Sequence, residues 1–326
     1  MKSLREIRRR ISSVQKTQKI TEAMQKVASA KLHRAQSALG YVLPYEERLR
    51  NILLDFVHEG CASCRGGDFF IDHPCILTRS IDARPVKRVS IVFVASHTGL
   101  CGAYNSNMER KLHDVLEDYA ALPQDHITLY PIGQKMREAV KDVPYNVSDS
   151  FVNLAEGLSI DEAVEFTQKL MSLYLKEETD KVELIYYHFR SMASQVISRD
   201  VFLPFQALPE EALLRMPDTE LKGKHGRLIP QEHQARVYDP METEGYLAEP
   251  DGPRFLDALL PHVLNYRMYL SLLDAQASEH AARALAMRTA SENAEDILKD
   301  LRLQYNKSRQ QAITREILDI VQGTVR

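Results

Sequence analysis

Residues 282–321 read ARALAMRTASENAEDILKDLRLQYNKSRQQAITREILDIV, the later half of a C-terminal stretch from about Arg254 to Arg326. After Pro261, nothing in this stretch breaks a helix before Gly323. Its apolar residues recur at steps of three or four, at Ala290, Ala294, Ile297, Leu301, Tyr305, Ile313, Ile317, Ile320 and Val321. This spacing predicts one helix with a narrow apolar seam, roughly 100 Å long at about 1.5 Å per residue. One domain of this chain cannot bury such a helix, so it requires a partner helix, a sheath of other chains, or both.

The N-terminus, residues 1–58, carries a second helical pattern. Its seam positions are Leu4, Ile7, Ile11, Val14, Ile20, Met24, Val27, Lys31, Leu32, Ala35, Leu39 and Val42. We expect Pro44 to kink this helix or to end its first segment. Helices at opposite ends of a chain can pair as an antiparallel coiled coil if the middle of the chain returns to its starting point.

Charge is distributed unevenly along the chain. Residues 1–34 contain ten Lys or Arg and two Glu, a local net of +8, whereas the whole chain of 326 residues carries −3. The basic end therefore favours an acidic partner. A nucleic-acid partner is not expected, because the basic residues share the same helical turns as the apolar seam instead of preceding it.

The middle of the chain, residues 87–208, alternates between strand and helix patterns, which predicts a Rossmann-like, mostly parallel sheet with flanking helices. The expected strands are Val89–Ala95, Ile127–Pro131, Val147–Val152, Val182–Phe189 and a weaker fifth at Val201–Leu208. The expected helices are one capped by Asn105 or Ser106 and reaching Ala120, one at Gln134–Val140, and one capped by Ser159 at Ile160–Glu178. The predicted fold class is α/β plus a long antiparallel coiled coil, in which residues 254–326 pair with residues 1–58.

Two connecting segments flank the α/β region. Residues 59–86 form a cysteine-containing linker, and residues 209–253 form a loop-rich insertion with a possible short hairpin near Gly226–Tyr238. The side chains that could hold zinc in a tetrahedral site are His58, Cys61, Cys64, His73 and Cys75. A redox-active thiol pair and ordinary reduced cysteines in a surface loop are the alternatives.

The turn Ser96–Asn107, after the first expected strand, is the place to seek an enzyme site. Its T-G-L-C-G-A run lacks the G-x-x-x-x-G-K-[ST] and G-x-G-x-x-G orders of phosphate-binding loops. Cys101 could act as a nucleophile if His97 or His126 lay beside it, whereas the glycines alone indicate a tight turn. We expect no catalytic residue and no cofactor. The longest apolar run, Val89–Ala95, is far shorter than the ~20 residues that span a bilayer.

Three stretches together resemble the gamma subunit of F-type ATP synthases. They are Ser3–Leu32, which begins SLREIRRRISSVQKTQKITEAM, Gly99–Asn107, which reads GLCGAYNSN, and Ala286–Val321, which contains AMRTASENA and YNKSRQQAITREILDIV. They occur in the order of the family's motifs and together span most of the chain. Residues 59–86 form a longer linker than is usual in that family.

The resemblance implies a non-catalytic rotor shaft. In the family, the paired terminal helices stand inside a ring of three alpha and three beta subunits, and the α/β domain lies beside the epsilon subunit and the membrane c-ring. Such a subunit couples proton-driven rotation of the c-ring to ATP synthesis or hydrolysis, as a peripheral protein on the cytoplasmic face of the bacterial inner membrane. The family positions that meet the ring correspond to Met24, Arg283, Arg309, Gln310, Thr314 and Glu316. From the residues alone, the alternatives are a coiled-coil adaptor and a nucleotide-binding α/β protein.

Overall fold

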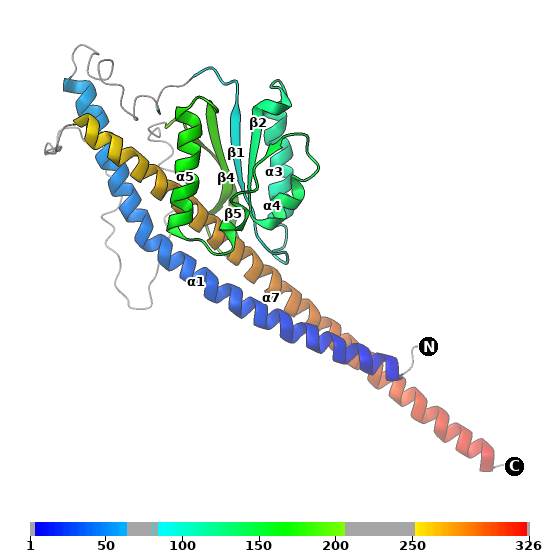
Figure 1. Ribbon diagram of the computed structural model, residues 1–326. Coiled ribbons are helices and arrows are strands. Elements are labelled where there is room, and N and C mark those ends of the chain that lie inside the picture. The colour runs from blue at the N-terminus through cyan, green and yellow to red at the C-terminus, as the bar shows by residue number, and fades with distance from the viewer. Residues whose placement is uncertain (1–3, 64–79, 81–83, 206–251, 325–326) are drawn as a thin grey trace.

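The computed structural model describes residues 4–63, 80, 84–205 and 252–324, apart from the side chains of residues 55–63, 252–253, 316 and 319–324. Two long helices, α1 (Leu4–Ser63) and α7 (Gly252–Thr324), lie side by side in opposite directions (Figure 1). The α/β domain sits against the first half of α7, and the C-terminal end of α7 projects past the N-terminal end of α1 (Figure 1). The predicted combination of an α/β domain with a coiled coil of terminal helices is confirmed.

The seam between the two helices follows a heptad repeat. On α1 the buried side chains of the seam include Ile7, Thr21, Ala28, Leu32 and Ala35. On α7 the corresponding buried side chains are Ala277, Ala281, Ala284, Met287, Ala294, Leu298 and Leu301. Small alanines at the centre of the seam let the two helix backbones approach closely, which keeps this part of the shaft thin.

Several residues that the sequence pattern placed in the seam face solvent instead, among them Ile20, Val27 and Ile297. Ile20 is 59% exposed, Val27 is 58% exposed and Ile297 is 46% exposed. The polar Thr21 and the small Ala28 take the seam positions, because a supercoil holds one register along its whole length. An apolar residue one position before a seam residue, such as Ile20 or Val27, therefore points to solvent although it is hydrophobic.

The two prolines inside the long helices do not end them. Pro44 lies within α1 and Pro261 lies within α7, so of the two outcomes expected at Pro44, a kink or the end of a segment, the second does not occur. Proline removes one backbone hydrogen bond, to the carbonyl four residues earlier. Pro44 and Gly40, four residues before it, are both exposed, so water can bond the carbonyl that the missing N–H leaves free.

The α/β domain is built on a five-stranded sheet with the order β3-β2-β1-β4-β5. Its strands are β1 (Val89–Val94), β2 (Ile127–Ile132), β3 (Asn146–Val147), β4 (Lys181–Phe189) and β5 (Gln195–Leu203). β1, β2, β3 and β4 are parallel, and β5 pairs antiparallel with β4.

Two predicted strands differ from the structure. The third was expected at Val147–Val152, but β3 has two residues, and Val152 begins the 3-10 helix η2 (Val152–Ala155). The fifth was expected at Val201–Leu208, but β5 starts six residues earlier and runs antiparallel. The reason is the tight turn at Ser191–Ser194, because so short a connection can join only antiparallel strands.

Helices cover both faces of the sheet. The short 3-10 helix η1 (Gln124–His126) leads into β2, while α3 (Tyr104–Asp118) and α4 (Gln134–Ala139) cover one face. The other face is covered by α5 (Ile160–Leu175) and by the first half of α7 (Figure 1). Ser159 caps α5 as predicted, since its hydroxyl accepts a hydrogen bond from the Asp161 N–H. One face of the domain is therefore closed by the shaft helix itself.

Candidate functional site

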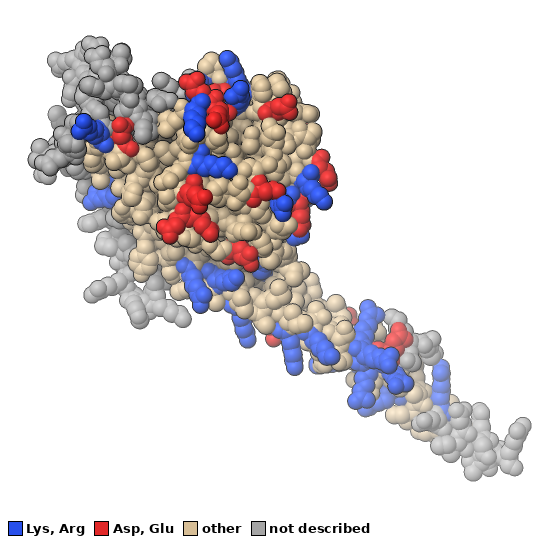
Figure 2. Space-filling view, viewed as in Figure 1, with Lys and Arg blue, Asp and Glu red and all other residues tan. Residues whose placement is uncertain are grey.

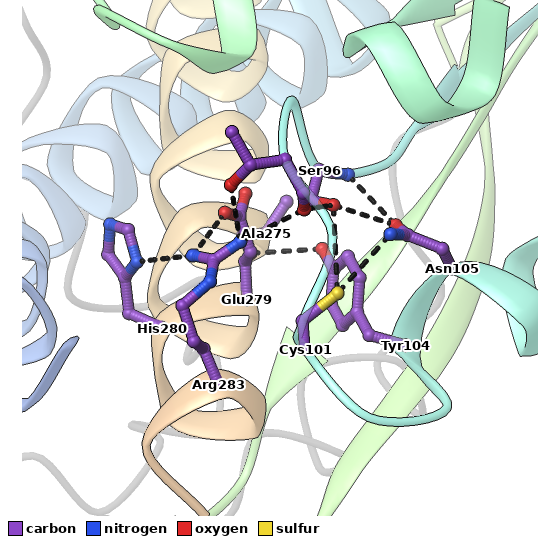
Figure 3. Close-up of polar contacts among 9 residues, drawn as sticks. Ser96, Cys101, Tyr104, Asn105, Ala275, Glu279, His280 and Arg283 are labelled. Atoms are coloured by element: carbon purple, nitrogen blue, oxygen red, sulfur yellow. Dashed lines mark hydrogen bonds and ion pairs between the residues drawn. The ribbon is translucent and has the colours of Figure 1, made fainter. Parts of the chain in front are cut away.

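Polar side chains join the α/β domain to α7 at the turn that follows β1. The turn after β1 lies against α7, where Arg283 reaches it (Figure 3). The Arg283 guanidinium donates to the Thr98 carbonyl at 3.1 Å and to the Thr98 hydroxyl at 3.0 Å. Its other terminal nitrogen donates to the Glu279 carboxylate at 2.7 Å. This side chain thus ties the turn to α7 within one chain.

Burial sets the charge states around Arg283. Glu279 is 7% exposed, and this burial raises its pKa, while the charge of Arg283 acts in the opposite direction. Burial, with help from the charges of Arg283 and Lys31, lowers the pKa of His280 to about 4. His280 is therefore neutral near pH 7, and Arg283 provides the charge that compensates Glu279.

The interior of the turn is held by its own side chains. The Ser96 N–H and hydroxyl both donate to the Asn105 side-chain oxygen, at 3.2 and 2.9 Å. Asn105 is thus not a helix cap; α3 begins at Tyr104, and its N-cap residue, Ala103, makes no side-chain capping bond. Gly102 has a φ of 62°, a left-handed conformation that glycine adopts without strain.

The structure gives Cys101 no histidine partner. Its sulfur lies 3.7 Å from the Ser96 hydroxyl and 3.2 Å from the Asn105 amide nitrogen, and the residue is buried. His97 pairs with Glu156, and His126 bonds the Lys87 carbonyl. The arrangement does not favour the nucleophile hypothesis, because no base contacts this thiol among the described residues.

A small cavity adjoins the turn, where α/β proteins commonly bind nucleotides. Its volume is about 10 Å³, enough for one water molecule. It is lined by Val94, Ala95, Tyr104, Leu154, Ala155, Leu158, Leu272, Ala275, Gln276 and Glu279. Because α7 fills the crevice and contributes a carboxylate to its wall, the geometry does not favour a nucleotide there.

A second set of contacts joins β4 to α7, and the sequence pattern did not reveal it. Asp274 accepts hydrogen bonds from the Phe189 N–H at 2.8 Å and from the His188 ring at 2.6 Å. One turn further on, the Ser278 hydroxyl donates to the Tyr187 carbonyl at 3.2 Å. Asp274 is one of several charged residues in the first part of α7, so nothing in the local sequence marked it as a contact to β4.

The predicted ring-facing residues fall into separate groups. Met24 is half-buried on α1, and Arg283 is at the junction described above. Exposed positions near the C-terminal end of α7 hold Arg309, Gln310 and Thr314. Glu316 belongs to the same part of α7, but its side chain lies outside the described residues. About 40 Å of helix separates Arg283 from Arg309, so these residues cannot form one site.

The basic residues of the shaft line the rod on the visible face. Figure 2 shows Lys and Arg projecting along the rod below the α/β domain, where few Asp or Glu accompany them. On the α/β domain, acidic and basic side chains are interspersed (Figure 2). On this face the rod thus presents a mainly positive surface to a partner.

The zinc hypothesis lies outside the described residues, because the structure does not describe the side chains of His58, Cys61, Cys64, His73 and Cys75. Within the described ranges, no three His, Cys, Asp or Glu side chains are grouped so that they could hold a metal ion. Among the described helices, none has a stretch that is both long and apolar enough to cross a membrane.

Comparisons with known proteins agree over the full length of the chain. The family model described as ATP synthase matches residues 3–325. The ATP synthase gamma chain of Phocaeicola vulgatus is 42% identical over 325 residues, covering 100% of both chains. The gamma chain of Cytophaga hutchinsonii is 36% identical, covering 99% of this chain and 98% of that relative.

Solved structures share the fold. A chain from the Euglena gracilis mitochondrial ATP synthase rotor is similar with a TM-score of 0.52 and 17% identity, covering 95% of this chain and 98% of that one. A chain from the Tetrahymena thermophila mitochondrial ATP synthase central stalk and c-ring gives a TM-score of 0.51 and 19% identity, covering 83% of this chain and 99% of that one. Taken with the full-length sequence matches, the chain belongs to the ATP synthase gamma chain family.

Proposed function

We propose that the chain is the central rotor shaft of an F-type ATP synthase. The observation that carries this proposal is a full-length match to gamma chains, combined with a 73-residue helix, α7, that starts in the α/β core and ends beyond α1. The shaft performs no chemistry itself and needs no cofactor. It couples proton-driven rotation of the c-ring to changes of conformation at the beta-subunit sites that make or hydrolyse ATP.

The expected partners divide along the length of the shaft. Three alpha and three beta subunits surround the coiled coil and the projecting end of α7. The epsilon subunit and the c-ring contact the opposite end, beside the α/β domain. Support comes from the similar solved chains, which belong to a rotor and to a central stalk with c-ring. The chain then works as a peripheral protein on the cytoplasmic face of a bacterial inner membrane.

The geometry suits transmission of torque. Two packed helices resist twisting better than one, and α7 is also built into the core of the α/β domain. Rotation inside a sheath requires contacts that do not fix one angle. Exposed Lys and Arg on the rod satisfy this requirement, because surface ion pairs contribute only about 0–1 kcal/mol each.

We assign contact with the ring to Met24, Arg283, Arg309, Gln310, Thr314 and Glu316. The exposed side chains of Arg309 and Gln310 are free to meet a beta-subunit loop at the end of α7. Arg283 differs from these, since most of its donors are used inside the chain. We therefore propose that Arg283 acts on the ring mainly by holding the Ser96–Gly102 turn in place.

Copurification and a matched pair of variants test the function. Tagged full-length chain should bring down alpha and beta subunits, and their absence would overturn the proposal. In the complex, Arg309→Ala with Gln310→Ala should lower ATP-driven proton pumping more than ATP hydrolysis. The control is Arg302→Ala with Gln304→Ala, two exposed positions about two turns away. A coiled-coil adaptor predicts no effect of either pair on an ATPase.

A further inference from the structure

One ionic contact holds the end of β4 to the shaft. Both oxygens of Asp274 on α7 face this strand end, where one accepts from the Phe189 N–H at 2.8 Å and the other from His188 Nδ1 at 2.6 Å. Asp274 is 9% exposed, so water does little to weaken the contact. A single carboxylate therefore fixes both the backbone and a side chain of the domain.

This contact differs in kind from its neighbours. The Ser278 hydroxyl donates to the Tyr187 carbonyl, and the Tyr104 hydroxyl donates to the Ala275 carbonyl at 3.1 Å. Those bonds join neutral groups and have the same strength at any pH near neutrality. The His188–Asp274 contact is different, because histidine changes its charge in this range.

We propose that His188 and Asp274 form a proton-dependent lock between the α/β domain and α7, tight when the imidazole is protonated and looser when it is neutral. Protonation turns a hydrogen bond between a neutral ring and a carboxylate into an ion pair with the same geometry. Protonation adds the attraction between two opposite charges to this bond, and the burial of Asp274 limits how far water screens that attraction. The lock goes beyond the shaft function proposed above, because it concerns how stiffly the shaft is joined to its own domain.

The charges around His188 support protonation. Asp274 on α7 contributes most to raising the pKa of His188, and Asp200 on β5 raises it further. Burial and Arg190, just after β4, lower this pKa. The net result raises the pKa of His188. Asp200 is itself bonded by the Tyr186 hydroxyl and lies near Arg267 of α7.

The direction of the pH effect follows from this raised value. An unfolded histidine titrates near 6.5. The stabilisation from the lock is then complete below about pH 6.5 and is lost as the pH rises through the higher pKa of the folded state. His188 Nε2 is buried and makes no hydrogen bond among the described residues, so protonation leaves an unpaired N–H there and opposes the charged form, while Asp274 favours it. Alkaline conditions should loosen the joint.

Hydrogen exchange on the full-length chain tests the lock without relying on the proposed function. The Phe189 amide donates to Asp274, so its protection, corrected for the intrinsic pH dependence of exchange, reports the contact directly. We expect this protection to fall about fivefold between pH 6 and pH 9, which is the size of effect expected when a partly exposed ion pair loses one of its charges. Deuterium uptake at the His188 ring carbon, followed by mass spectrometry, gives its titration midpoint in the same samples.

Three variants separate the lock from general loosening. Asp274→Asn keeps an oxygen for the Phe189 N–H but removes the charge, and it should abolish the pH dependence, as should His188→Gln. Ser278→Ala removes the neutral neighbouring bond, so it should lower protection equally at all pH values. Amides of β1 serve as a check of folding. A flat wild-type profile, an equal slope in His188→Gln, or a His188 midpoint below 6.5 would each overturn the lock.

Discussion

The two ends of α7 have similar residues and opposite surroundings. In the first part, Leu260, Leu264 and Met268 are fully buried against the α/β domain and α1. Near the other end, Leu303 is 68% exposed and Ile317 is 56% exposed. One helix thus changes from the core of a domain into an uncovered rod. The first part of α7 is therefore stabilised by contacts within the chain. The apolar side chains near its C-terminal end are exposed and available to contact other proteins.

The polar residues repeat the same contrast. At the domain end, Asp274, Ser278 and Arg283 each bond a residue of the α/β domain. At the projecting end, the Thr314 hydroxyl bonds only to the Gln310 carbonyl of its own helix. The domain end is therefore specified by contacts across the chain, and the projecting end by helix-local ones. The following predictions test how far this division holds.

The largest effect is expected from truncating a leucine at the domain end. Leu264→Ala should lower the free energy of unfolding by about 2–5 kcal/mol, because it opens a cavity in the core. Leu303→Ala, the same change at an exposed position, should cost less than about 0.5 kcal/mol. Urea unfolding of the full-length chain gives both values. Equal losses would show that the projecting end is also covered within the chain.

The second largest loss of stability is expected at the contact between Arg283 of α7 and the turn after β1. Arg283→Ala should cost about 3 kcal/mol, since it leaves the buried Glu279 without its counter-charge. Thr98→Ala removes only one hydroxyl acceptor and should cost about 1 kcal/mol. Arg309→Ala at the exposed end is the control, with little change expected. The same unfolding measurement applies, and a cost for Arg283→Ala no larger than for Arg309→Ala would contradict the internal role of Arg283.

A pH dependence on the acid side should arise from His280. Its pKa in the folded chain is lowered to about 4, mainly by burial, while an unfolded histidine titrates near 6.5. Between these values the unfolded state binds a proton that the folded state does not, so stability falls as the pH drops. At pH 5 the loss should be about 1–2 kcal/mol. His280→Gln should remove it, whereas His262→Gln, an exposed change on the same helix, should keep the wild-type slope.

The smallest effect on stability is expected from a substitution at the projecting end of α7, where we expect a loss of coupling instead. Ile317→Ser should change the free energy of unfolding by less than about 0.5 kcal/mol, because the side chain is already 56% exposed. In the assembled complex it should weaken coupling between ATP hydrolysis and proton pumping. A large loss of stability in the isolated chain would mean that this residue is covered by its own protein.

The ring-facing residues stay a prediction from the family resemblance, and the sequence did not show that they fall into separate groups. The family resemblance identified Arg283 and Arg309 together, and nothing in their spacing distinguished a tied side chain from an exposed one. The structure separates them, because the Ser96–Gly102 turn reaches α7 at only one of the two positions. The His188–Asp274 contact joins residues 86 positions apart, a distance over which local patterns carry no information.

The sequence by itself determined the two long helices and the alternating α/β region, because periodicity and capping act over a few residues, while the family resemblance implied that the chain ends pair. Ser159 as a cap and β1 as a buried strand are examples. Only the tertiary structure decided that Thr21 and not Ile20 faces the seam, that β5 runs antiparallel, and that α7 closes one face of the sheet. Each of these depends on a register or a contact set by the whole assembly of elements, which local hydrophobicity cannot specify.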